Sequence, residues 1–86
     1  MSSILRVGNL PATVTERDLT KHFSRYGSVS RLTIARDSVT GTSRRFADIE
    51  MSDDEGALAT VKWLHLSQFD GRTITVMLIN ASHAVI

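Results

Sequence analysis

The stretch Asp37–Met51, with the sequence Asp-Ser-Val-Thr-Gly-Thr-Ser-Arg-Arg-Phe-Ala-Asp-Ile-Glu-Met, decides how we expect the chain to fold. It begins as a turn around Gly41 and passes through two adjacent arginines into an alternating pattern typical of a strand. Phe46, Asp48 and Glu50 fall on one side of this strand, and apolar residues fall on the other. We expect the apolar side to pack on the core, and the side with one aromatic and two acids to face water.

Before this stretch, the pattern predicts a strand, a helix and a second strand. Ile4–Val7 alternates as a strand, with Leu5 and Val7 inward. Thr15 is a suitable N-cap for the helix, which we expect to end at Gly27. The next strand is Val29–Arg36. Its predicted outward residues are Arg31, Thr33 and Ala35.

After it, the pattern predicts a second helix and a final strand. Asp53–Glu55 places acids at the positive end of the helix dipole. Leu66–Asp70 is predicted to be a connection, and Gly71 leads into a strand over Thr73–Ile79. The predicted inward residues of these two elements are Ala57, Thr60, Val61 and Leu64 in the helix, and Ile74, Val76 and Leu78 in the strand.

This order of elements predicts an α+β fold, the ferredoxin-like βαββαβ sandwich, in which both helices cover one face of a four-stranded antiparallel sheet. Right-handed crossovers place the first and third strands in the middle. The other face is then open to solvent. The residues predicted on it are Arg6, Arg31, Thr33, Arg44, Phe46, Asp48, Glu50, Thr75 and Met77.

The composition indicates one small folded domain over residues 1–86. Hydrophobic residues make up 42% of the chain and charged residues 22%, a balance typical of a globule. There is no cysteine, which excludes disulfides and thiolate sites and favours an intracellular location, either cytoplasmic or nuclear. Eight Lys and Arg against three acids give residues 1–46 a net charge of +5, and two against six give residues 47–86 a net charge of −4. This asymmetry gives modest support for a polyanionic partner.

No pattern in the chain predicts an enzyme, a metal site or a cofactor site. His22, His65 and His83 lack metal-ligand spacing, and there is neither a phosphate-binding loop nor a nucleophile motif. His22 lies near the apolar stripe of the first helix, and we interpret it as a packing residue. We therefore expect a binding protein with no catalytic residues.

Two segments resemble the signatures of the RNA recognition motif (RRM) family. Leu-Arg-Val-Gly-Asn-Leu at 5–10 resembles the first-strand hexamer, and Arg-Arg-Phe-Ala-Asp-Ile-Glu-Met at 44–51 resembles the third-strand octamer. The resemblance covers residues 4–81 and leaves a short tail at 82–86. It implies the same sandwich, with single-stranded RNA held on the open face. Three further segments match the family pattern in the same order: Thr15–Gly27, Asp37–Arg44 and Asp70–Val76.

The chain departs from the family at two of three stacking positions. Arg6 and Asp48 stand where the family commonly has aromatics, Arg45 stands where it has glycine, and Phe46 remains. Two missing rings remove about 2–6 kcal/mol of base stacking. That loss lowers the affinity by about 10-fold to 10⁴-fold. Arg6 restores part of it by stacking its guanidinium on bases, and it is expected to pair with Asp48 across the strands.

We therefore predict a monomer that binds single-stranded RNA weakly and contacts no membrane. The alternative is an RRM-like protein-interaction module, which would use the helix surface near Trp63 and Leu58, or the sheet together with the apolar tail Ala84–Ile86. The predicted RNA-binding residues are Arg6, Asn9, Arg31, Thr33, Arg36, Arg44, Arg45, Phe46, Asp48, Glu50, Thr75, Met77 and Asn80.

Overall fold

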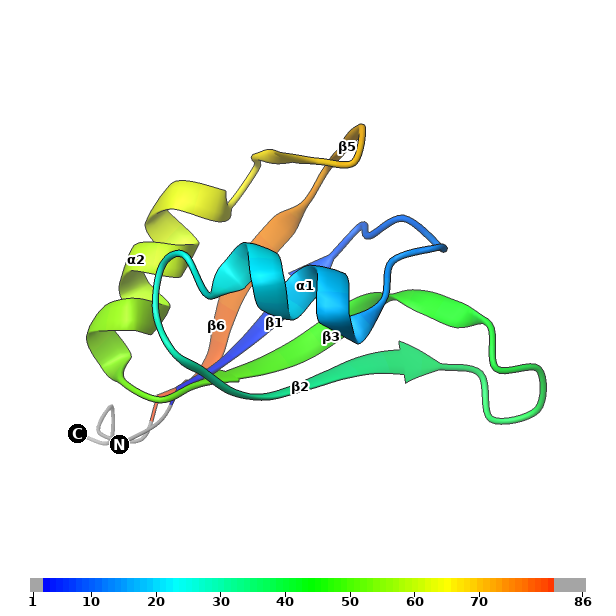
Figure 1. Cartoon of the computed structure of the whole chain (residues 1–86), viewed down its shortest axis with the longest axis horizontal. Coiled ribbons are helices and arrows are strands. Elements are labelled where there is room, and N and C mark those ends of the chain that lie inside the picture. The colour runs from blue at the N-terminus through cyan, green and yellow to red at the C-terminus, as the bar shows by residue number, and fades with distance from the viewer. Residues whose placement is uncertain (1–2, 82–86) are drawn as a thin grey trace.

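Both helices lie on one face of a four-stranded antiparallel sheet in the computed structural model, which describes residues 3–81 and, at 80 and 81, the backbone alone (Figure 1). The strand order is β2-β3-β1-β6, so the predicted sandwich with the first and third strands in the middle is confirmed. The predicted tail at 82–86 lies outside the described residues. The elements are β1 (Ser3–Gly8), α1 (Glu16–Phe23), β2 (Val29–Arg36), β3 (Ser43–Met51), α2 (Asp54–Leu64), β4 (Gln68–Phe69), β5 (Arg72–Thr73) and β6 (Thr75–Ala81).

The predicted alternation of β3 is confirmed. Ala47, Ile49 and Met51 are 0% exposed and lie against the helices. Leu5 and Val7 of β1 stand opposite Ile49 and Ala47 in the antiparallel register and are equally buried. The two central strands therefore give the core a continuous apolar floor, and their alternate residues must face the other way.

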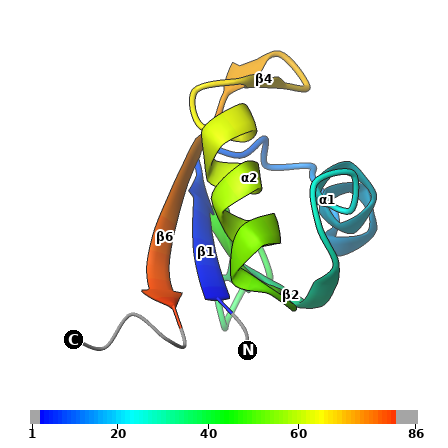
Figure 2. The same cartoon turned by 90° about the vertical axis from the view of Figure 1, so that its left-hand side faces the viewer.

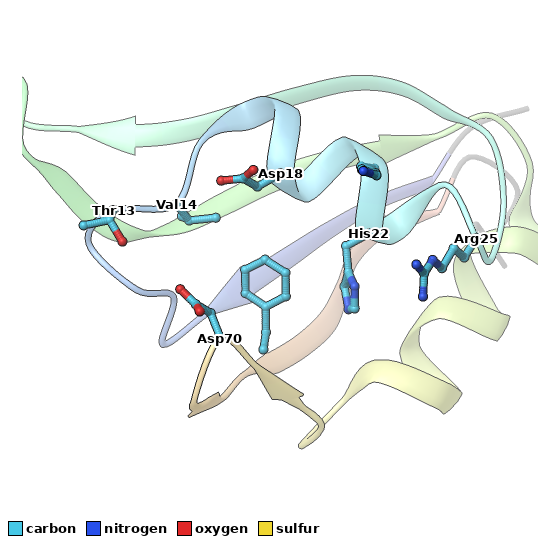
Figure 3. A pocket seen from close by; sticks show the side chains of 8 residues that line it. Thr13, Val14, Asp18, His22, Arg25 and Asp70 are labelled. Carbon is cyan, nitrogen blue, oxygen red and sulfur yellow. The ribbon is translucent and has the colours of Figure 1, made fainter.

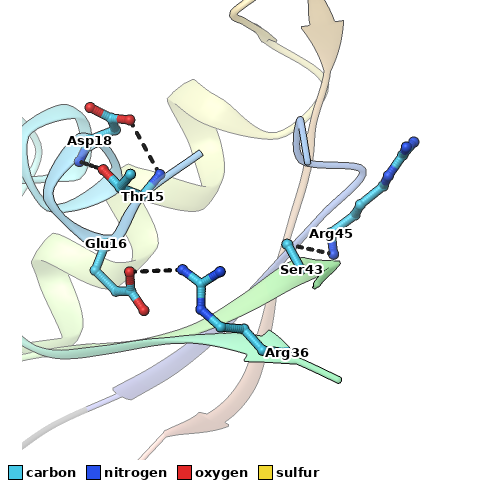
Figure 4. Close-up of polar contacts among 6 residues, drawn as sticks. All are labelled: Thr15, Glu16, Asp18, Arg36, Ser43 and Arg45. Carbon is cyan, nitrogen blue, oxygen red and sulfur yellow. Dashed lines mark hydrogen bonds and ion pairs between the residues drawn. The ribbon is translucent and has the colours of Figure 1, made fainter. Parts of the chain in front are cut away.

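Helix α1 begins at the predicted cap but ends earlier than predicted. The Asp18 N–H donates to Thr15 Oγ1 and the Thr15 N–H donates to Asp18 Oδ2, each at 3.2 Å, which completes a capping box (Figure 4). The last helical residue is Phe23, and the Ser24 N–H donates to the Thr20 carbonyl at 2.9 Å. The prediction that the helix ends at Gly27 is wrong.

Gly27 has a different role, in packing. A Cβ atom at Gly27 would lie 2.9 Å from the Cα of Gly56 in α2 and 2.9 Å from Cε of Met51. Real Cβ atoms do not approach other heavy atoms so closely. The chain after α1 therefore passes close against the first turn of α2, and position 27 has no space for a Cβ atom unless its neighbours shift.

Helix α2 begins as predicted, with Asp53 as the N-cap accepting from the Gly56 N–H. Ala57, Thr60 and Leu64 are buried beneath it, as expected. Both helices lie on the same side of the sheet when the molecule is turned by 90° (Figure 2). Within residues 3–81, no helix is long and apolar enough to span a membrane.

The region after α2 differs from the prediction. Leu66–Asp70 was expected to be a connection, but it contains β4, which pairs with β5 in a small hairpin. The last strand of the main sheet begins at Thr75, two residues later than expected. Leu78 lies on its inner side opposite Leu5 but is 39% exposed, because β6 is an edge strand.

Candidate functional site

The open face is the side of the main sheet turned away from both helices. Arg6 stands opposite Asp48 and Met77 in the register, and Ile4 stands opposite Glu50 and Asn80. Strand β2 adds Thr33 opposite Asp48, on the far side of β3. These pairings place predicted site residues from all four strands on one surface.

Arg6, Asp48 and Phe46 form the centre of the open face. The Arg6 guanidinium donates from Nε to Asp48 Oδ1 at 2.9 Å and from Nη2 to Asp48 Oδ2 at 3.2 Å, so the predicted cross-strand pair is present. The Cζ atom of Arg6 lies 5.1 Å from the centroid of the Phe46 ring, within cation–π range. The hydrogen bond from Arg6 to Asp48, followed by the carboxylate charge, raises the pKa of Arg6 above its ordinary value. The guanidinium therefore stays charged and presents a flat surface beside the ring.

A hollow of about 210 Å³ lies on the open face, one register step from this centre. Its lining residues come from every strand of the main sheet: Ile4, Arg31, Thr33, Asp48, Glu50 and Ile79. Arg31 and Glu50 stand opposite each other across β2 and β3. Within residues 3–81, neither of these two side chains forms an ion pair, so their charges face the solvent in the hollow.

Asn9 was predicted as a site residue, but its side chain holds the hairpin. Its Nδ2 donates to the Thr73 carbonyl at 2.7 Å, and its Oδ1 accepts from Arg72 Nη2 at 2.6 Å. Arg72 Nε also donates to the Asn9 carbonyl at 3.1 Å. Asn9 has a left-handed φ of 60°, which asparagine tolerates better than most residues. These contacts use the polar atoms of the Asn9 amide to join the end of β1 to β5.

The arginines at the end of β2 and the start of β3 point in different directions (Figure 4). Arg36 Nη2 donates to Glu16 Oε1 at 3.1 Å and so reaches toward α1. Arg45 has a φ of 67°, its N–H donates to Ser43 Oγ at 3.0 Å, and its carbonyl accepts from the Leu10 N–H at 2.9 Å. Its side chain extends away from the other residues drawn, and Arg44 is exposed beside it. The irregular start of β3 thus leaves two exposed arginines at the rim of the open face.

Strand β6 supplies the last predicted site residues. Thr75 stands opposite Gly8, and Met77 stands opposite Arg6 and is exposed. The backbone of Asn80 is opposite Ile4, whereas its side chain lies outside the described part of the structure. Two lining residues of the hollow, Ile4 and Ile79, were absent from the predicted set. Alternation turns both of them outward, because Ile4 precedes the inward Leu5 and Ile79 follows the inward Leu78. The sequence has no signal, however, for the register shift between Ile4 and Leu5 in the pairing of β1 with β6.

A second pocket, of about 410 Å³, lies between α1 and the β4–β5 hairpin (Figure 3). His22 packs in it against the Phe69 ring, with centroids 4.8 Å apart. The predicted packing role is therefore confirmed. Burial, and then the charge of Arg25, lower the pKa of His22 below its ordinary value. Among the described residues, no group of three or more His, Cys, Asp or Glu side chains is placed to hold a metal ion.

Comparisons with known proteins agree with this geometry. Residues 5–75 match the family model described as the RNA recognition motif. The putative RNA-binding protein RbpE of Nostoc sp. (strain PCC 7120) is 41% identical over 70 residues, which cover 81% of this chain and 71% of that protein. The chloroplastic RNA-binding protein CP33 of Arabidopsis thaliana is 39% identical over 72 residues, which cover 84% of this chain and 22% of that protein.

Solved structures show the same likeness. The crystal structure of RNA binding protein PG1 matches with a TM-score of 0.86 and 36% identity, covering 88% of this chain and 92% of that one. The structure of the Rna15 RRM with bound RNA (GU) matches with a TM-score of 0.79 and 28% identity, covering 96% of this chain and 86% of that one.

Proposed function

The chain belongs to the RNA recognition motif family, and from this premise we propose that it binds single-stranded RNA on the open face of its sheet. One observation carries the proposal. The Phe46 ring of β3 lies on the open face, with the Cζ atom of Arg6 in the neighbouring β1 5.1 Å from its centroid. No helix of residues 3–81 covers this face of the sheet. An aromatic ring and a guanidinium plane on such a face are the surfaces on which single-stranded bases stack.

The proposed mode of binding uses Phe46 as a platform for one base. Arg6 then acts in one of two ways: it stacks on the neighbouring base, or it leaves Asp48 and binds a phosphate. Asp48 restrains Arg6 through two hydrogen bonds in the free protein. RNA binding therefore competes with an existing pair, which agrees with the weak affinity predicted from the missing rings.

Electrostatic attraction is expected to be modest. Arg31, Arg44 and Arg45 are exposed at or near the open face and are available for phosphate contacts. Asp48 and Glu50 on the same face oppose them. If RNA binding neutralises about three phosphates, the logarithm of the binding constant should fall against the logarithm of the salt concentration with a slope of about −2 for a single strand.

We propose that this RNA binding takes place in the cytoplasm.

The test is a titration of single-stranded oligonucleotides of about eight nucleotides, a length that one small domain can cover. Fluorescence anisotropy at low salt measures the affinity of the wild type and of Phe46→Ala. Loss of one stacking platform should weaken binding by about 5- to 150-fold. Trp63→Ala is the matched control, because Trp63 is an exposed aromatic on α2, away from the open face. Equal affinities of the two variants would contradict the proposal.

The alternative function, a protein-interaction module on α2, has less support. Trp63 and Leu58 are 63% and 58% exposed, which is compatible with a docking surface. However, Lys62 Nζ lies 5.5 Å from the Trp63 ring centroid, so part of this exposed ring already has a neighbour on its own helix. The relative RbpE and the solved structure of PG1 are RNA-binding proteins by name, and this likeness favours RNA binding over a protein-interaction role.

A further inference from the structure

The hollow beside the Arg6 and Phe46 platform has the chemistry of a site for one particular base. We propose that it holds guanine, with Glu50 accepting from the base and Arg31 donating to it. This inference rests on the proposed RNA binding and specifies which base the open face prefers. The volume of about 210 Å³ is below that of pockets for drug-sized ligands, about 300–1,000 Å³, and suits a single base.

The hollow contains two charged side chains, Arg31 and Glu50, that form no ion pair among the described residues. Arg6 and Asp48 satisfy each other with two hydrogen bonds, so Asp48 has little capacity left for a base. Arg31 and Glu50 occupy the equivalent cross-strand position between β2 and β3 but form no ion pair within residues 3–81. A carboxylate accepts through two oxygens, and a guanidinium donates through a planar fork. The hollow therefore presents an acceptor and a donor side by side.

Guanine is the base that complements this arrangement. Its Watson–Crick edge carries two adjacent donors, N1–H and the N2 amino group, which a carboxylate can bind together. Its O6 and N7 atoms are acceptors that a guanidinium can bind with two hydrogen bonds. Each other base places an acceptor beside its donor on the Watson–Crick edge, so a carboxylate there meets repulsion as well as a hydrogen bond.

The remaining walls fit a flat, partly apolar ligand. Ile4 and Ile79 supply apolar surface from β1 and β6, and Thr33 adds a hydroxyl from β2. The hollow lies along the sheet from Phe46, with the Arg6 and Asp48 pair between them, since Ile4 and Glu50 are one register step beyond Arg6 and Asp48. A base stacked on Phe46 and a guanine in the hollow can therefore belong to the same strand of RNA.

The test uses uridine oligonucleotides of about eight nucleotides that carry guanine, inosine, adenine or uracil at one central position. The base of inosine, hypoxanthine, is guanine without the N2 amino group, so inosine removes one of the two donors. The wild type should bind the guanine oligonucleotide best, with inosine intermediate and adenine and uracil weakest. A bidentate contact discriminates by about 5- to 150-fold between guanine and adenine. The variant Glu50→Gln should reduce this ratio toward one.

Glu55→Gln is the control, because it removes the same charge from the first turn of α2, on the other side of the sheet. It should keep the preference for guanine, and thermal melting should show that both variants remain folded. If RNA binds but the wild type treats all four oligonucleotides alike, or if Glu50→Gln keeps the full preference, the guanine site is overturned while RNA binding stands. If no oligonucleotide binds, both the proposed function and the guanine site fail.

Discussion

The two faces of strand β3 differ although they are made of alternate residues of the same nine-residue segment. On the inner face, Ala47, Ile49 and Met51 are completely buried and their neighbours are all protein atoms. On the open face, Phe46 and Asp48 contact Arg6, while Glu50 reaches no charged partner among the described residues. The inner face is closed by packing, whereas the open face presents aromatic and charged groups to the solvent.

This difference separates stability from binding. A side chain on the inner face contributes through the apolar area and the close packing that it provides, so its loss is felt by the whole fold. A side chain on the open face has few packing partners, so its loss should change what the protein binds and leave the fold nearly intact. Substitutions on the two faces should therefore give opposite results in unfolding and RNA-binding assays.

The largest effect is expected from the inner face. Ile49→Ala should lower the free energy of unfolding by about 2–5 kcal/mol, because it leaves a cavity between the sheet and the helices. Ile49→Val should cost only about 0.5–1.5 kcal/mol. Urea denaturation measures both, and the RNA affinity of the molecules that remain folded should equal that of the wild type. A loss of RNA affinity with unchanged stability would break the separation of the two faces.

A smaller loss of stability is expected from a substitution at Gly27, which lies outside the sheet, between α1 and β2. Gly27→Ala adds a methyl group where Gly56 Cα and Met51 Cε lie 2.9 Å away. Forcing these groups apart should cost about 1–3 kcal/mol. Gly41→Ala, in the exposed turn, is the comparison: its added Cβ would meet no atom within 4 Å, but its φ of 75° is unfavourable for alanine. A change at Gly27 no larger than a few tenths of a kcal/mol would show that α2 can shift away.

Local patterns in the sequence were sufficient to predict these two faces. The alternation through Phe46 and Ile49 depends only on the period of a strand, and the cap at Thr15 depends only on residues within one turn. For the same reason the sequence predicted that Arg6 and Asp48 would pair, once the order of the strands was inferred. These features need no knowledge of how distant segments pack.

The features that the sequence did not predict depend on distant contacts. The close approach at Gly27 is set by α2, almost thirty residues later along the chain. Asn9 is held by Arg72 and Thr73, in a hairpin whose two-residue strands are too short to show a period. Arg36 was grouped with the RNA-binding arginines, but its direction is determined by Glu16 on α1. Alternation placed Arg31 and Glu50 on the open face, yet it could not show that their charges would remain unpaired.

On the open face, Asp48→Asn should raise the RNA affinity, whereas most substitutions on this face should lower it. It removes the carboxylate that restrains Arg6 and that repels phosphates, so RNA affinity should rise by about two- to fivefold, the size of one surface charge interaction. Stability should change little, because the side chains of Arg6 and Asp48 are 50% and 41% exposed. Asp70→Asn makes the same change of charge in the hairpin and should leave affinity nearly unaltered. A loss of affinity in Asp48→Asn would mean that the paired arginine is the form that RNA recognises.

The smallest effect is expected at His22, a polar residue on the helix side of the molecule. Burial disfavours its charged form, the Arg25 charge adds to this, and both lower the pKa of His22. Its Nε2 atom is buried without a hydrogen-bond partner among the described residues, which also agrees with a neutral ring packed on Phe69. The unfolded chain, with an ordinary histidine pKa of about 6.5, binds a proton more readily than the folded protein does.

The sign of the pH dependence follows from this difference in proton binding. The stability that neutral His22 contributes is fully present above the pKa of the unfolded chain, and it is lost as the pH falls through the lower pKa of the folded protein. Urea denaturation at a series of pH values from about 7.5 to 5 should therefore show a decline in wild-type stability that is shallower in His22→Gln, since glutamine does not titrate. Parallel curves for the two proteins would contradict this, because they would show that the folded protein protonates His22 as readily as the unfolded chain does. The two proteins should have the same RNA affinity at neutral pH, because His22 lies on the side away from the open face.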